Sequence, residues 1–144
     1  MKKGSEMLHL RRFKMDSLVR EKMPSSIKKL GGHVQIRRLD SETYSHYLKL
    51  KLKEEVEEVC KAETPKDIKE EIADVLEVIY TLAKSYGLQL EHIEQTRVQK
   101  RKERGGFNKG IFAEYVEVDT EEGDDEHPII QYCLDDPEKY PEML

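Results

Sequence analysis

Two long amphipathic segments joined by almost no linker constrain the fold of this chain more than any other feature of its sequence. Residues 64–67 read Thr-Pro-Lys-Asp, which supplies a capping hydroxyl, a proline at the first helical position and an acid in the first turn. We expect one helix from Asp40 or Ser41 to about Ala62 and the next up to Tyr86, where a glycine follows as the C-terminal cap. Because the linker is so short, the two helices must pack as an antiparallel hairpin.

The rest of the chain also favours helices. Charged residues make up 38% and aromatics 7%, a balance typical of long amphipathic helices rather than of a β-sandwich. A short helical stretch is expected over 16–32, with Pro24 forcing a bend or restart, and a longer helix over about 90–104. Short extended connectors are possible at 33–39 and 111–118. The predicted fold is an all-α helical bundle around the central hairpin.

Charge divides the sequence into three parts. Residues 1–15 form a basic arm, 16–113 a helical domain and 114–144 an acidic extension, in which twelve acidic side chains face one lysine. The tail therefore carries a net charge of -11 and the first 113 residues +6. Residues 119–126 are too acidic to bury, and we expect a mobile stretch there.

The sequence gives no sign of a membrane segment. The basic arm lacks the apolar core of a signal peptide, and no apolar run approaches the length of a membrane span. Cys60 and Cys133 lie far apart and in no metal-binding spacing, so zinc and a disulfide framework are both disfavoured. We expect a soluble protein of the reducing cytoplasm, without a membrane partner.

Two pairs of acids flank the apolar stripes of the hairpin, Glu55 with Glu58 and Glu71 with Asp74. Glu58 lies about 6 Å before the end of its helix and Glu71 about 9 Å after the start of the next, so they should face each other. Glu55 and Asp74 then form a second level one turn further from the loop. The stripes themselves are Leu48, Leu52, Val56 and Val59 in the first helix, and Ile68, Ile72, Val75, Leu76, Ile79 and Leu82 in the second.

Four carboxylates crowded against apolar surface repel one another and lose solvation, which calls for cations. Hard divalent ions prefer oxygen ligands, and magnesium is the usual one where phosphates complete the coordination, with manganese as a substitute. A single E-x-x-E on a charged helix is usually a coincidence of solvated side chains, as expected for Glu57 and Glu77. Two acid pairs at matched depth instead favour a metal site at Glu55, Glu58, Glu71 and Asp74.

The spacing E-x-x-E, twelve residues, E-x-x-D resembles the signature of the all-α nucleotide pyrophosphohydrolase superfamily, which includes MazG, dimeric dUTPases and phosphoribosyl-ATP pyrophosphohydrolase. Residues 18–24, L-V-R-E-K-M-P, resemble the K-L-V-R-D-K-I-P opening of a MazG-like subgroup labelled phosphoribosyl-ATP pyrophosphohydrolase-like. Residues 103–112 resemble its E-R-G-G-F, K-G-I-F ending. The resemblance covers 16–113 and departs from the pattern at Ser17, where lysine is usual, and at Glu21, where aspartate is.

This resemblance implies magnesium-dependent hydrolysis of a nucleoside triphosphate to the monophosphate and pyrophosphate, with a metal-bound water attacking the α-phosphorus. It also implies a homodimer or higher oligomer, in keeping with apolar stripes on more faces than one chain can cover. Glu54, next to the first ligand, is a candidate general base, its alternative being an exposed helix acid. Canonical nucleotides, damaged nucleotides and phosphoribosyl-ATP all stay open as substrates.

Basic side chains are needed to hold the polyphosphate. Three arginines at i, i+4 and i+7 share one face of the fourth helix, although a solvated basic face is the alternative for each. The candidates are Arg20, Lys22, Arg97, Lys100, Arg101, Arg104 and Lys109.

Two other functional classes stay open, a catalytically idle helical interaction module and a nucleic-acid-binding accessory protein. Overall acidity and the scarcity of aromatics for stacking argue against nucleic acid.

Overall fold

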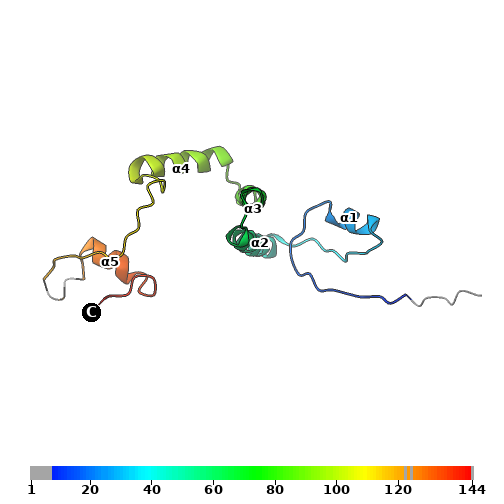
Figure 1. Ribbon diagram of the computed structural model, residues 1–144, viewed down its shortest axis with the longest axis horizontal. Helices are drawn as coiled ribbons and strands as arrows, with labels where there is room; N and C mark the ends of the chain where they lie inside the picture. The colour runs from blue at the N-terminus through cyan, green and yellow to red at the C-terminus, as the bar shows by residue number, and fades with distance from the viewer. Residues whose placement is uncertain (1–7, 122, 124, 144) are drawn as a thin grey trace, which may run out of the picture. The chain divides into compact units, whose positions relative to one another are not determined.

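The computed structural model describes residues 8–121, 123 and 125–143, and these contain five helices and no strand. None of the helices in these ranges is long and apolar enough to cross a membrane. The chain divides into two compact units, residues 1–100 and 101–144, each described by itself. The five helices and the absence of strands in the described ranges confirm the all-α prediction. In chain order the helices are α1 (Met23–Lys29), α2 (Ser41–Lys61), α3 (Pro65–Ser85), α4 (Leu90–Arg104) and α5 (Pro128–Leu134) (Figure 1).

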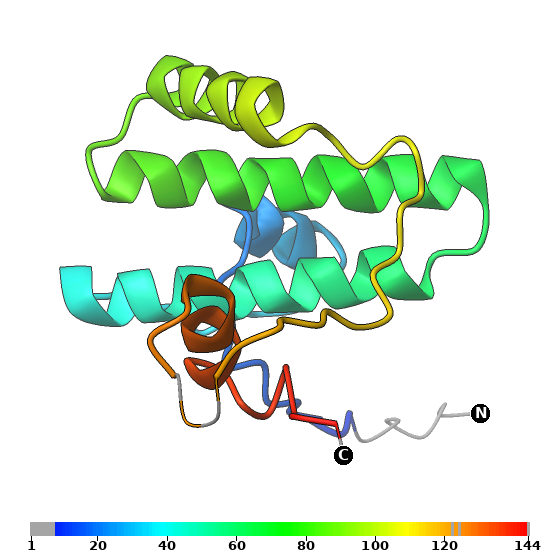
Figure 2. The same ribbon diagram turned by 90° about the vertical axis from the view of Figure 1, so that its left-hand side faces the viewer.

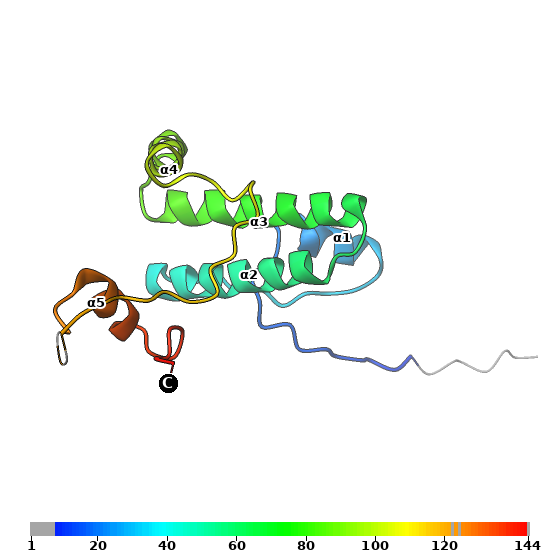
Figure 3. The same cartoon turned by 60° about the vertical axis from the view of Figure 1, so that its left-hand side comes forward.

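Helices α2 and α3 form the antiparallel hairpin that the sequence predicts (Figures 2 and 3). The Asp40 side chain caps α2 by accepting a hydrogen bond from the Thr43 amide at 2.8 Å. The Thr64 hydroxyl caps α3 by accepting from the Asp67 amide at 3.1 Å. After α3 the chain turns at Gly87, whose φ of 67° is the left-handed conformation that favours glycine. Local capping chemistry thus sets the start of each hairpin helix and the end of α3.

Burial in the hairpin is shallow. Among the described residues only Leu48, Val78 and Ala83 are buried, with exposed fractions of 3%, 9% and 5%. Two members of the predicted α3 stripe, Ile72 and Leu76, keep 46% and 42% of their surface exposed. The described chain therefore leaves a considerable part of its apolar surface exposed.

Helix α1 is shorter than the predicted stretch over 16–32. It begins at Met23, next to Pro24, because proline lacks the amide hydrogen that an interior helical position requires. Asp16 has a φ of 41°, which is incompatible with a helix at that point. The chain leaves the helix through Leu30 and Gly31, whose φ is 84°. The restart expected at Pro24 is confirmed, whereas the helical start at 16 is wrong.

The acidic extension contains α5, which the sequence analysis did not predict. Its start carries the signals of a helix N-terminus, since the His127 side chain accepts from the Ile129 amide at 3.2 Å and Pro128 follows. The Tyr132 and Tyr140 hydroxyls lie 3.1 Å apart and pin the following turn to the helix. The expected mobile stretch over 119–126 includes residues 122 and 124, which lie outside the described residues.

Candidate metal centre

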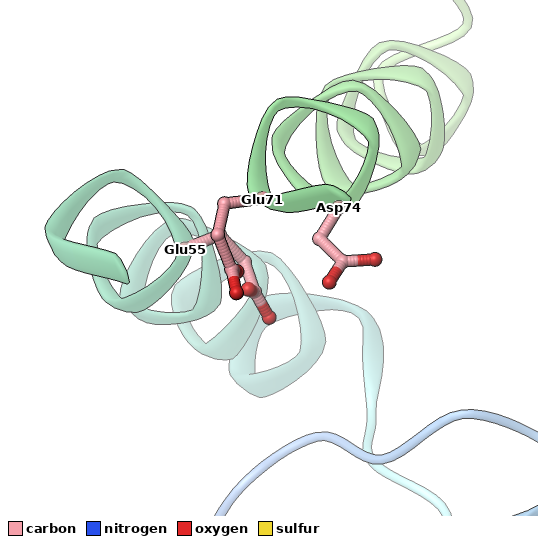
Figure 4. A group of neighbouring side chains, drawn as sticks. All are labelled: Glu55, Glu71 and Asp74. Carbon is pink, nitrogen blue, oxygen red and sulfur yellow. The ribbon is translucent and has the colours of Figure 1, made fainter. Parts of the chain in front are cut away.

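Three carboxylates from the two hairpin helices meet on one side of the pair. Oxygens of Glu55, Glu71 and Asp74 all lie within 4.8 Å of one another, and all three residues are half-buried (Figure 4). Glu71 and Asp74 are three residues apart and so share a face of α3, while Glu55 reaches them from α2. The structure thus brings together three of the four predicted ligands, which we call the acidic cluster.

Glu58, the fourth predicted ligand, lies outside this group. Its side chain is 47% exposed, and its carboxylate lies 3.6 Å from the Lys61 ammonium on the same helix. The expected facing pairs, Glu58 with Glu71 and Glu55 with Asp74, are replaced by a set in which Glu55 joins both α3 acids. Solvation accounts for the difference, because the exposed Glu58 carboxylate keeps its water, with the Lys61 ammonium at i+3 adding a weak attraction.

Glu71 is the member of the cluster whose pKa is raised by its surroundings. Loss of solvation raises the pKa of its carboxyl above the ordinary value, and repulsion from Asp74, Glu58 and Glu55 raises the pKa further. Glu58 is thus close enough to act on Glu71 although it stands outside the cluster. A bound cation would offset this repulsion and lost solvation, and would therefore favour the charged form of the Glu71 carboxylate.

Replacing Glu71 by glutamine should stabilise the metal-free protein at pH 7. An acid whose pKa is raised by folding destabilises the folded state once it is ionised, and the amide removes that cost. As the pH falls through the raised pKa, the wild-type residue becomes neutral as well, so the difference between the two proteins should vanish. Thermal unfolding in EDTA across pH 4–8 measures this, with Glu77→Gln on the exposed side of α3 as the control. A lower midpoint for Glu71→Gln at pH 7 would contradict the assignment.

Lys51 is a member of the site that the sequence analysis missed. Its ammonium lies 3.1 Å from the Glu55 carboxylate and 3.0 Å from that of Glu54, and its side chain is only 24% exposed. Burial works against the charge, but the hydrogen bonds that Lys51 donates to the two glutamates outweigh it and raise the pKa of Lys51. The i+3 and i+4 spacing from lysine to the two acids was the signal available in the sequence. Glu54, the candidate base, is therefore held by a lysine beside the cluster.

Arg20 reaches the cluster from the chain segment before α1. Its guanidinium donates a 2.5 Å hydrogen bond to Asp74, 54 residues away in the sequence. The residue predicted to bind phosphate thus lies directly against a predicted metal ligand. Together, Lys51 on Glu55 and Arg20 on Asp74 supply positive charge at two members of the cluster.

The other basic candidates of the first unit lie on helices. Lys22 is the exposed N-cap residue of α1. Arg97 is held by Glu94 through two hydrogen bonds of 2.8 and 2.6 Å, so its guanidinium is engaged within its own helix. Lys100 is exposed on the same helix. Of these, Arg97 would have to leave a bidentate partner before it could bind a phosphate.

Arg101, Arg104 and Lys109 belong to the second unit, at the end of α4 and in the turn that follows. A Cβ atom built on Gly106 would lie 3.3 Å from the Arg101 guanidinium carbon. The second glycine of the Gly-Gly pair therefore lets the chain pass close to the Arg101 side chain. The first glycine of the pair, Gly105, has a φ of 81°, the left-handed conformation that favours glycine.

A protein-family model described as the MazG-like family matches residues 44–117. The chain belongs to the MazG-like family. The matched segment contains both acid pairs of the hairpin and residues 103–112, but not the L-V-R-E-K-M-P segment that carries Arg20. No curated protein and no solved structure gives a significant match to the chain. The donor set of this MazG-like hairpin is carboxylate oxygen only, which fits a hard divalent cation such as magnesium.

Proposed function

We propose that this MazG-like chain is a magnesium-dependent nucleotide pyrophosphohydrolase that converts a nucleoside triphosphate to the monophosphate and pyrophosphate. The observation that supports this most is the acidic cluster, three half-buried carboxylates within the segment that the family model matches. The proposal places the activity in the cytoplasm, in keeping with the two free cysteines, Cys60 and Cys133.

Glu55, Glu71 and Asp74, with Glu58 one turn away, are the residues proposed to hold magnesium, for which manganese can substitute. The metal would acidify a bound water and neutralise charge on the phosphates. Lys51 contacts the Glu55 carboxylate at 3.1 Å and the Glu54 carboxylate at 3.0 Å, and thereby helps to hold the site in shape. Glu54 keeps its proposed role as the proton acceptor, with Lys51 positioning it. The basic candidates of the first unit, Arg20 above all, would contact the polyphosphate.

Release of pyrophosphate from a panel of nucleotides tests this function. Canonical and damaged nucleoside triphosphates and phosphoribosyl-ATP belong in the panel, since each stays open as a substrate. An idle interaction module would hydrolyse none of them at any magnesium concentration. A nucleic-acid accessory protein would instead bind a polyanion column and elute at moderate salt, a behaviour that a net charge of -5 does not favour.

We expect a homodimer or a higher oligomer in solution, because one chain leaves so much of its hairpin stripes uncovered. Ile72 and Leu76, both more than 40% exposed, would be covered by a second copy. Light scattering at micromolar concentration should give a mass at least twice the 16.9 kDa of one chain. A particle of single-chain mass under these conditions would contradict the expectation.

A further inference from the structure

We propose that Arg20 is a charge-exchange residue, which covers Asp74 while the acidic cluster lacks a cation and turns to the phosphates of the substrate once a divalent cation binds there. The inference rests on the proposed function, since it assigns one residue two alternative partners at that site. Arg20 acts on the cluster through Asp74 and is thus a positioning residue before substrate arrives.

The Arg20–Asp74 ion pair is weak enough to separate when a cation binds. The two side chains are 66% and 40% exposed, so their contact is made largely in water. Ion pairs in such surroundings are held by little free energy. A guanidinium on Asp74 also repels a divalent cation a few ångströms away, so the two positive groups compete for the same carboxylate. Binding of the cation must therefore weaken this pair.

Lys51 is held differently from Arg20. It contacts Glu54 and Glu55 at once and is 24% exposed, so it keeps Glu54 as a partner when Glu55 turns to a cation. Arg20 has Asp74 as its one carboxylate partner among the described residues. Of the two basic residues at the cluster, Arg20 is thus the one that is released.

Arg20, which contacts Asp74, also lines a hollow into which its released guanidinium can turn. It has a volume of about 1450 Å³ and lies between the segment before α1, α1 itself and the connector to α2, with Arg20 in its lining. Two acids, Asp16 and Glu21, also line it. Its cationic side chains outnumber them: Arg11, Arg12, Lys14, Arg20 and Arg37. A hollow of this charge suits an anionic ligand, and the planar fork of arginine matches a phosphate.

The exchange predicts effects of opposite sign for one substitution. Arg20→Met removes the competitor from Asp74, so manganese should bind the nucleotide-free protein about two- to fivefold more tightly. The same substitution removes a charge-assisted contact to phosphate, so the KM for the nucleotide should rise about tenfold or more. Manganese binding is followed by the loss of the electron paramagnetic resonance signal of the free ion, without any turnover.

Two further variants separate the exchange from a general charge effect. Lys14→Met removes one positive charge from the same segment, but Lys14 pairs with Asp16 at 3.1 Å and not with the cluster. Manganese affinity should stay within about 1.5-fold of wild type in this control, because an exposed charge without a contact to the site is screened. Arg20→Lys keeps the positive charge but loses the planar guanidinium that can donate two hydrogen bonds to one phosphate. Manganese affinity should therefore stay near that of wild type, while the KM for the nucleotide still rises.

Each outcome decides the inference. Unchanged or weaker manganese binding by Arg20→Met, or tightening of equal size in Lys14→Met, would overturn the exchange while leaving the hydrolase proposal intact. If Arg20→Met binds manganese more tightly but has an unchanged KM, Arg20 does not contact the phosphates of the substrate. A wild-type protein that neither binds manganese nor hydrolyses a nucleotide would refute the proposed function itself, and the inference with it.

Discussion

Glu71→Gln and Asp74→Asn should each abolish nucleotide hydrolysis in magnesium. Both substitutions remove a carboxylate oxygen from the acidic cluster and change side-chain volume very little. The loss of kcat should exceed the roughly 10- to 100-fold that follows when only an outer partner of a metal ligand is lost. Steady-state release of pyrophosphate at saturating magnesium measures the effect. For Glu71→Gln it should accompany the gain in metal-free stability described above, so misfolding cannot explain the lost activity.

The matched control is Glu77→Gln, which makes the same change on the exposed side of α3. It should keep nearly full activity. Glu58→Gln should lose activity as the cluster variants do, since Glu58 lies near enough to raise the pKa of Glu71. Near-normal turnover by Glu71→Gln or Asp74→Asn would show that the cluster is not the catalytic metal site, and near-normal turnover by Glu58→Gln alone would reduce the site to three carboxylates.

Leu48→Ala should be the most damaging substitution for stability. Leu48 is 3% exposed and is one of only three buried residues among those described, so its truncation leaves a cavity where the hairpin has few other buried side chains. Truncations of this kind cost about 2–5 kcal/mol. Urea unfolding at matched protein concentration checks this, because the stability of an oligomer depends on concentration.

Leu50→Ala is the control for this prediction. Leu50 stands two residues along the same helix and is 42% exposed, so it should lose less than about 1 kcal/mol. Equal losses for the two variants would contradict the packing described for α2 and α3.

The hairpin could be predicted from the sequence because short-range chemistry defines it. The caps at Asp40 and Thr64 each involve an amide three residues away, and Gly87 ends α3 by its own backbone preference. That acids of both helices approach one another also follows from helix geometry once the linker is short, although the pairing within the group differs from the predicted one. Helix geometry did not show that the Glu58 side chain stays in the solvent, near Lys61, instead of joining the acidic cluster.

Local sequence patterns do not predict contacts between residues that are far apart in the chain. Arg20 meets Asp74 across 54 residues, and no spacing in the sequence indicates that contact. Lys51 is a different case. Its i+4 relation to Glu55 is present in the sequence, but it does not stand out among the many charged positions of the helix. Helix α5 was missed because the acidity of its surroundings outweighed the His127-Pro128 start signal.

The central claim is that magnesium-dependent attack by water occurs at the α-phosphorus of a nucleotide held at the acidic cluster. Hydrolysis in ¹⁸O-labelled water, followed by ³¹P nuclear magnetic resonance of the products, tests it most directly. The account predicts a nucleoside monophosphate that carries one ¹⁸O atom and unlabelled pyrophosphate, with no reaction in EDTA. Label in the pyrophosphate, release of orthophosphate, or turnover that persists without a divalent metal would contradict it.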